Sequence, residues 1–166
     1  MRILFTLLLS GLFVSGGLAQ SRVTADEIIS KINKGQTVTY ENVTITGTLD
    51  LTDLENRTMT DKDKKWWGND YEKYESTVTV SVRFENCKFE GAVIAYYHDE
   101  SENDTYIAHF DKDVSFRNCV FEEESEFKYS EFDEGADFYG ASFEEDANFK
   151  YAEFDQAPVF TQATFS

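Results

Sequence analysis

Acidic side chains recur at a fixed distance in the C-terminal part of the chain and could bind a cation. The run Glu122–Glu124 returns 22 residues later as Glu144–Asp146, and Asp133 returns at the same distance as Asp155. Stacked carboxylates repel one another unless a cation such as calcium lies between them. No segment has the spacing of a known calcium loop. We therefore interpret these ladders as a solvated acidic surface and predict no metal site.

Histidine-based chemistry has little support. His98 lies among acidic residues, whereas His109 lies between Ala108 and Phe110 and should point outward. No third zinc ligand is evident, and the sequence has no Gly-rich phosphate loop, nucleophile elbow or Cys–His motif. We therefore expect a non-enzymatic protein with no catalytic residue and no cofactor.

Two irregular segments are rich in aromatic residues. Exposed aromatic side chains often anchor protein or glycan partners, although a tryptophan can equally pack over an edge and close its own loop. The candidate partner-contact residues are Trp66, Trp67, Tyr71, Tyr74, Tyr96 and Tyr97.

These segments interrupt a regular pattern of phenylalanines. From Phe110 to Phe165, phenylalanine recurs in alternating steps of six and five residues, and a small or compact residue lies two positions before each one. Side chains separated by one residue share a face of an extended segment, whereas an amphipathic helix would need apolar residues at i, i+3, i+4 and i+7. The pattern predicts short strands joined by corners, four to a 22-residue coil, with the rings inside.

The pattern resembles a known family. The clearest motifs, a small residue, any residue and then Phe, are Ala136–Phe138, Ala147–Phe149 and Ala152–Phe154. They are similar to the pentapeptide-repeat proteins, in the variant with alternating five- and six-residue steps. The resemblance covers Phe110–Phe165 strongly and Val38–Phe89 more weakly. It implies an all-β fold, a right-handed quadrilateral parallel β-helix (solenoid). Pro158 departs from the motif, because proline has no N–H to donate to the next coil.

The N-terminus has the pattern of a secretory signal peptide, residues 1–19. Arg2 is followed by the apolar run Ile3–Val14, and small residues at Gly17 and Ala19 precede a cut before Gln20. The run is shorter than the roughly 20 residues of a membrane-spanning helix. We expect an exported bacterial protein, periplasmic or extracellular, with no membrane span after cleavage.

The net charge of the chain limits which classes of partner it can bind. The chain has 32 acidic and 15 basic residues, a net charge of −17, and loss of Arg2 with the signal leaves 14 basic residues and −18. This charge argues against direct binding to nucleic acid or anionic membranes. We favour a scaffold that binds an unknown protein or envelope polymer. The alternative, implied by the family resemblance, is a DNA mimic that inhibits or protects a DNA-binding enzyme such as gyrase. Export disfavours that alternative, because gyrase is cytoplasmic.

A short helix should cap the coils. Thr24–Glu27 forms a capping box, Ile28 and Ile32 give an apolar face, and Gly35 follows the end. We predict a capping segment over 20–37 that contains a helix at about 25–34, because the open end of a solenoid needs cover.

The β-helix should occupy 38–166, with insertions near 55–76 and 95–105. In the first coil we expect the ring positions to be taken by aliphatic residues, which are Val38, Val43, Leu49 and Leu54. Insertions in solenoids leave from one face and often carry binding.

Two further expectations concern stacking. Cys87 and Cys119 should occupy equivalent inward positions on adjacent coils, and we favour free thiols over a disulfide because stacked strands rarely orient the sulfurs well. After Phe165 no amphipathic segment covers the last rung. Either the natural chain continues, or two copies stack end to end as a homodimer.

Overall fold

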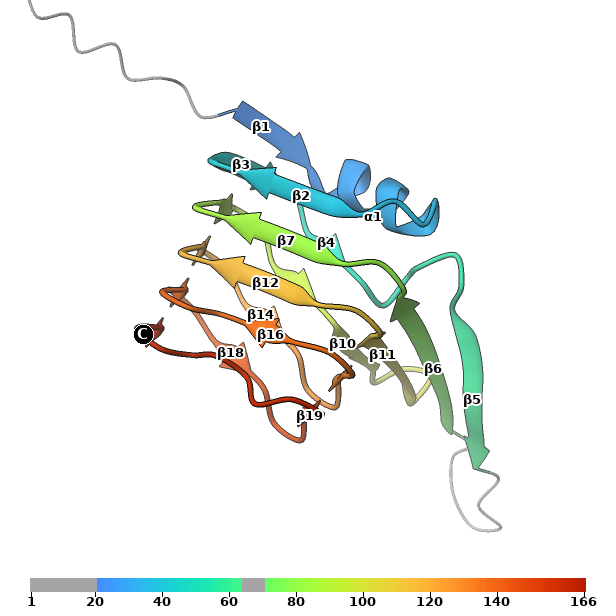
Figure 1. Ribbon diagram of the computed structural model, residues 1–166. Coiled ribbons are helices and arrows are strands. Elements are labelled where there is room, and N and C mark those ends of the chain that lie inside the picture. Colours follow the sequence, from blue (N-terminus) through green and yellow to red (C-terminus); the bar gives the residue numbers. More distant parts are fainter. Residues whose placement is uncertain (1–20, 64–70) are drawn as a thin grey trace, which may run out of the picture.

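The computed structural model is a stack of coils with one short helix at its N-terminal end (Figure 1). It describes residues 21–63 and 71–166. The predicted signal peptide, residues 1–19, lies outside the described residues, as do Trp66 and Trp67. Most strands pair in parallel with the strand one coil away, as a right-handed parallel β-helix requires. The predicted fold class is confirmed.

The first three walls of the coil are regular parallel sheets. The first wall comprises β2 (Val38–Glu41), β7 (Val82–Glu85), β12 (Val114–Arg117) and β16 (Ala136–Asp137). The second wall comprises β1 (Ser21–Thr24), β3 (Val43–Thr46), β8 (Lys88–Phe89), β13 (Val120–Phe121), β17 (Ser142–Phe143) and β20 (Thr164–Phe165). The third wall comprises β4 (Leu49–Asp50), β9 (Val93–Ile94), β14 (Ser125–Glu126) and β18 (Ala147–Asn148).

The fourth wall is the irregular one. Its path is β5 (Thr58–Asp63), β6 (Tyr71–Val78), β11 (Asp104–Phe110), β15 (Glu131–Phe132) and β19 (Glu153–Phe154), and β10 (Tyr96–Asp99) pairs with β11 outside that path. β5 with β6, and β10 with β11, are antiparallel hairpins, whereas β6 and β11 pair in parallel. The two insertions therefore join into one sheet in the order β5–β6–β11–β10, which we call the wing. In Figure 1 β5 and β6 extend away from the coils.

The helix α1 (Ala25–Asn33) covers the first coil, as expected. Thr24 Oγ1 accepts a hydrogen bond from the Glu27 N–H at 3.2 Å, which caps the helix start. Ile28 and Ile32 are buried in the same apolar cluster as the coils, and Gly35 follows the helix with a φ of 67°. Among the described residues, no helix is long and apolar enough to cross a membrane.

Stacked phenylalanine rings fill the coils. Ring centroids on adjacent coils lie 4.6 Å apart for Phe110 and Phe132, and 4.9 Å apart for Phe138 and Phe160, with the planes nearly parallel. Rings from different walls meet edge to face, as Phe127 and Phe138 do at 72°. The interior is thus a set of parallel ring columns locked together by edge contacts, which are favourable arrangements for aromatic pairs.

The register of the first coil differs from our expectation. Val38 pairs with Val82 and Tyr40 pairs with Phe84, so Val38 takes the small-residue position and Tyr40 the ring position. Ile45 likewise lies opposite Phe89. The prediction that Val38, Val43, Leu49 and Leu54 replace Phe is wrong. The physical reason is that on the second and third walls both inward positions of this coil hold aliphatic side chains of similar size, which are Val43 with Ile45 and Leu49 with Leu51, so spacing alone could not distinguish them.

Stacking also places the cysteines and the last rung. Val120 pairs with Lys88, so Cys119 lies beside Cys87 on the adjacent coil, and both are buried free cysteines, as expected. Phe143 is buried, whereas Phe165, which stacks on it at 4.9 Å, is 55% exposed. The end-to-end homodimer stays a prediction.

We expect Phe138→Ala to reduce the free energy of unfolding by about 3–5 kcal/mol, because it removes a fully buried ring from its column. Glu144→Ala removes an exposed side chain and should change stability by less than about 0.5 kcal/mol. Urea denaturation of both variants measures the difference. Equal losses would contradict the assignment of rings inside and acids outside.

Two buried serines should respond in opposite ways to removal of the hydroxyl. Ser130 Oγ is buried without a hydrogen-bond partner, so Ser130→Ala should raise the free energy of unfolding by about 1 kcal/mol. Ser76 occupies the same position two coils away, where its hydroxyl donates to the Thr52 carbonyl at 2.8 Å and accepts from the Leu54 N–H at 3.4 Å. Ser76→Ala should destabilise by about 1–3 kcal/mol. A loss of stability in both variants on urea denaturation would disprove the assignment for Ser130.

Candidate functional site

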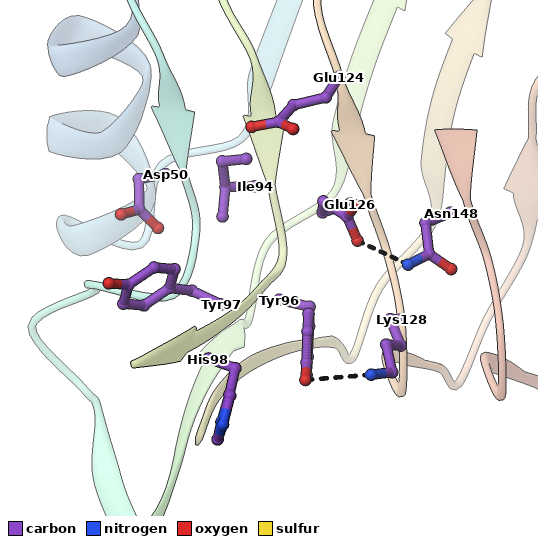
Figure 2. Close-up of a pocket in the computed structure, with 9 residues that line it drawn as sticks. All are labelled: Asp50, Ile94, Tyr96, Tyr97, His98, Glu124, Glu126, Lys128 and Asn148. Atoms are coloured by element: carbon purple, nitrogen blue, oxygen red, sulfur yellow. Dashed lines mark hydrogen bonds between the residues drawn. The ribbon is translucent and has the colours of Figure 1, made fainter. Parts of the chain in front are cut away.

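A groove of about 530 Å³ lies where β10 meets the outer face of the third wall (Figure 2). Its floor is one column of outward-facing residues, because Asp50 pairs with Ile94 and Glu126 pairs with both Ile94 and Asn148. Asn148 Nδ2 donates to Glu126 Oε2 at 2.9 Å. We call this feature the third-wall groove.

The strand β10 supplies the other side of the groove. Lys128 Nζ donates to the Tyr96 hydroxyl at 3.1 Å and lies 4.5 Å from the centre of the Tyr96 ring. Figure 2 shows Tyr96 directed toward Lys128. Tyr97, the next residue, is 51% exposed. One tyrosine therefore holds the lysine, while the other remains available to a ligand.

A row of tyrosines crosses the wing. Tyr74 stacks on Tyr106 with ring centres 5.0 Å apart, and Tyr106 lies 6.0 Å from Tyr97. The Arg57 guanidinium lies over both Tyr74 and Tyr106, and Arg57 pairs with Asp53 at 2.6 Å. This tyrosine row borders a smaller hollow of about 210 Å³ that shares Asp50 and Tyr97 with the third-wall groove.

Strand alternation explains why the row faces this side. Tyr74 has the same parity in β6 as Ser76 and Val78, which point into the coil, and Tyr106 has the same parity in β11 as the inward Phe110. The first halves of β6 and β11 lie beyond the corner beside the third wall and therefore outside the coil. There, the face that points into the coil in the second halves of these strands no longer covers the interior. Both tyrosines lie on this continuation of the face, where Tyr106 lines the hollow and Tyr74 stacks on Tyr106.

A second aromatic ladder lies at the corner between the third and fourth walls. Tyr129 and Tyr151 stack at 5.1 Å, although both have positive φ values, 59° and 62°. The corner between the first and second walls has residues suited to that conformation, such as Asn118 and Gly140. Because the stacked rings cover one another's faces, the ladder offers ring edges and hydroxyls more than a flat sugar-binding platform.

The carboxylates of the groove are poorly compensated. Among the ion pairs formed by residues 21–63 and 71–166, none includes Asp50, Glu124 or Glu126. Burial raises the pKa of Glu126, and the nearby Glu124 and Asp146 raise it further, while Asn148 and Lys128 oppose that shift. The groove therefore has a negative potential.

The histidines have local structural contacts. His98 Nδ1 lies 3.1 Å from Thr105 Oγ1 across the β10–β11 hairpin, and His109 Nδ1 accepts a hydrogen bond from the Glu131 N–H at 3.0 Å. Among the described residues, no group of three or more His, Cys, Asp or Glu side chains is placed to hold a metal ion.

Comparison with known families agrees with this architecture. A family model described as pentapeptide repeats (9 copies) matches residues 108–153 and 127–166. This match identifies residues 108–166 as pentapeptide repeats. Comparisons with curated proteins and with solved structures gave no match. The pentapeptide-repeat match begins at Ala108, where β11 enters the coil, so the β5–β6 hairpin and β10 lie outside the matched repeats.

The structure brings together only part of the predicted set of contact residues. Tyr96 and Tyr97 line the groove, and Tyr74 belongs to the tyrosine row. Tyr71 begins β6 at the far end of the wing. Trp66 and Trp67 lie outside the described residues.

The sequence analysis missed several contributors. Among them are Asp50, Arg57, Tyr106 and Glu126. Tyr106 could have been found from its parity with Ala108 and Phe110. Glu126 could have been found because it lies one position before an inward Phe and must face outward.

We expect Glu126→Gln to stabilise the protein at pH 7, because the folded state raises the pKa of this carboxyl above the ordinary value of 4.5. Below that value the side chain is protonated in both folded and unfolded chains, so the advantage of Gln should disappear as the pH falls through the window just above 4.5. Urea denaturation at several pH values measures the effect. Glu144→Gln makes the same charge change at an exposed site and is the control. An advantage that grows on acidification would contradict the assignment.

Proposed function

We propose that the protein is an exported, non-enzymatic scaffold that binds a protein or a cell-envelope polymer through the wing and the third-wall groove. The observation that carries the proposal is that both interruptions of the repeat leave at the same corner and join into one sheet. Loops and hairpins on a rigid framework carry binding more often than the framework itself.

The rest of the molecule supports this choice by exclusion. The coil interior is filled with stacked rings such as Phe116, Phe121 and Phe127, which leaves no room for a ligand. The regular walls carry short ion pairs, for example Lys112 with Glu134 and Arg117 with Asp137. The groove instead combines exposed aromatic surface with carboxylates that lack ion pairs.

A second candidate is a DNA mimic that acts on an enzyme such as gyrase. The net charge of −17 favours it. The two candidates differ in compartment, because a gyrase-directed protein must stay in the cytoplasm, whereas the pattern of residues 1–19 predicts export.

The test is deletion of residues 57–75, closed with a short Gly-Ser link. The two ends of the deletion are already adjacent, because Asn56 Nδ2 donates to the Thr77 carbonyl at 2.7 Å and Asn56 Oδ1 accepts from the Thr77 N–H at 3.2 Å. The coils should therefore keep their fold by circular dichroism. Pull-down from the envelope fraction with the parent and the deleted chain should show partners that only the parent retains.

The controls separate the two candidates. Glu144→Gln, on the second wall side of the coil, should retain every partner. The parent should be recovered outside the cytoplasm with Gln20 as its first residue. A deleted chain that keeps every partner would exclude the β5–β6 hairpin and leave the third-wall groove and the acidic walls as the binding surface, because no residue that lines the groove lies in 57–75. Recovery in the cytoplasm with residues 1–19 intact would favour the DNA mimic.

A further inference from the structure

We propose that the third-wall groove binds a basic polypeptide segment, with lysine or arginine side chains seated between Asp50 and Glu126. This inference rests on the proposed function and names the chemistry of the partner. Its basis is the combination of a groove, uncompensated charge and exposed aromatic surface on one face of the molecule (Figure 2).

The first step concerns charge. The groove contains Asp50, Glu124 and Glu126 but a single lysine, Lys128. Lys128 is already engaged by the Tyr96 hydroxyl and lies over the rings of Tyr96 and Tyr129. The carboxylates therefore attract cations from outside, and a partly buried carboxylate such as that of Glu126 gains from a nearby positive charge.

The second step concerns spacing. Asp50 and Glu126 belong to one column but are separated by the coil that contributes Ile94. At about 4.8 Å per coil, their backbones lie about 10 Å apart. The two carboxylates are thus separate charges, and among the residues that the structure describes no group of three or more His, Cys, Asp or Glu side chains is placed to hold a metal ion. Separate ammonium or guanidinium groups can occupy the two ends.

The third step concerns the apolar surface between the charges. Ile94 is a half-buried aliphatic residue on the outer face of the wall. Lysine and arginine side chains cover such surfaces with their methylene stems while their charged heads reach carboxylates. Tyr97, which is 51% exposed, offers a ring face or edge for a guanidinium.

The fourth step concerns length. The groove continues into the hollow beside the tyrosine row, because both are lined by Asp50 and Tyr97. The hollow adds Asp53 and Asp99, of which Asp53 pairs with Arg57. A continuous acidic and aromatic path of this kind suits an extended chain with several cations better than a compact diamine.

The experiment is calorimetric titration of the full protein with hexa-arginine at physiological salt. The double variant Asp50→Asn/Glu126→Gln should bind about tenfold more weakly, because two charge contacts are lost. The matched control, Glu131→Gln/Glu144→Gln, changes the net charge equally at two exposed sites away from the groove and should stay within about twofold. Tyr97→Leu should weaken binding about threefold, because it removes the ring but keeps an apolar side chain.

Three outcomes would overturn the inference. Equal weakening in both double variants would mean that hexa-arginine responds only to the net charge. Equal affinity for spermidine and hexa-arginine, with the same sensitivity to the groove variant, would assign the groove to a polyamine. Unchanged affinity in a groove variant that is folded at least as stably as the parent would remove the groove as the site. In that last case, partner loss on deletion of 57–75 would leave the proposed function intact.

Discussion

The match between ring stacking and backbone pairing is the constraint on which this structure depends. Parallel strands set the distance between coils at about 4.8 Å, and ring centres on adjacent coils lie 4.7 Å apart for Phe121 and Phe143 and for Phe132 and Phe154. A ring on every coil fits only when its inward neighbour on the same strand is small, as Ala136 and Ala141 are. The backbone hydrogen bonds between coils and the contacts between stacked rings therefore require the same distance from one coil to the next.

This constraint limits where the chain can depart from the repeat. A segment that leaves the coil must return so that its inward-facing residue pairs with the inward-facing residue of the adjacent coil. Ser76 and Ala108, which pair with each other, mark the two points of return. Because both hairpins re-enter on the fourth wall, their returning strands β6 and β11 are held in parallel and continue their pairing outside the coil. The wing is thus an extension of the coil, and the hollow beside it exists because two insertions share one corner.

The sequence was sufficient for much of the fold and for little of the site. The phenylalanine spacing from Phe110 onward predicts the coils, since only one register puts rings inside, and Thr24 marks the helix start through its side-chain oxygen. The first coil could not be placed, because Val38 and Tyr40 are both compatible with the interior. The groove could not be predicted either. It requires knowing that β10 folds back on β11, so that Tyr97 meets Tyr106 across a hairpin, and this contact does not follow from a local period.

The continuation of the interior face past the corner means that one strand serves two purposes along its length. In β11, Tyr106 and Phe110 have the same parity, yet Phe110 is sealed in the core and Tyr106 faces the hollow. Selection at Phe110 would act on how the side chain packs in the core. Selection at Tyr106 would act on what contacts the surface of the protein. In β11, the change from surface residues to core residues occurs at Ala108. Within β11, the residues before this alanine that share the parity of Tyr106 could therefore vary with the surface that they form, while Phe110 after it stays under the demands of folding.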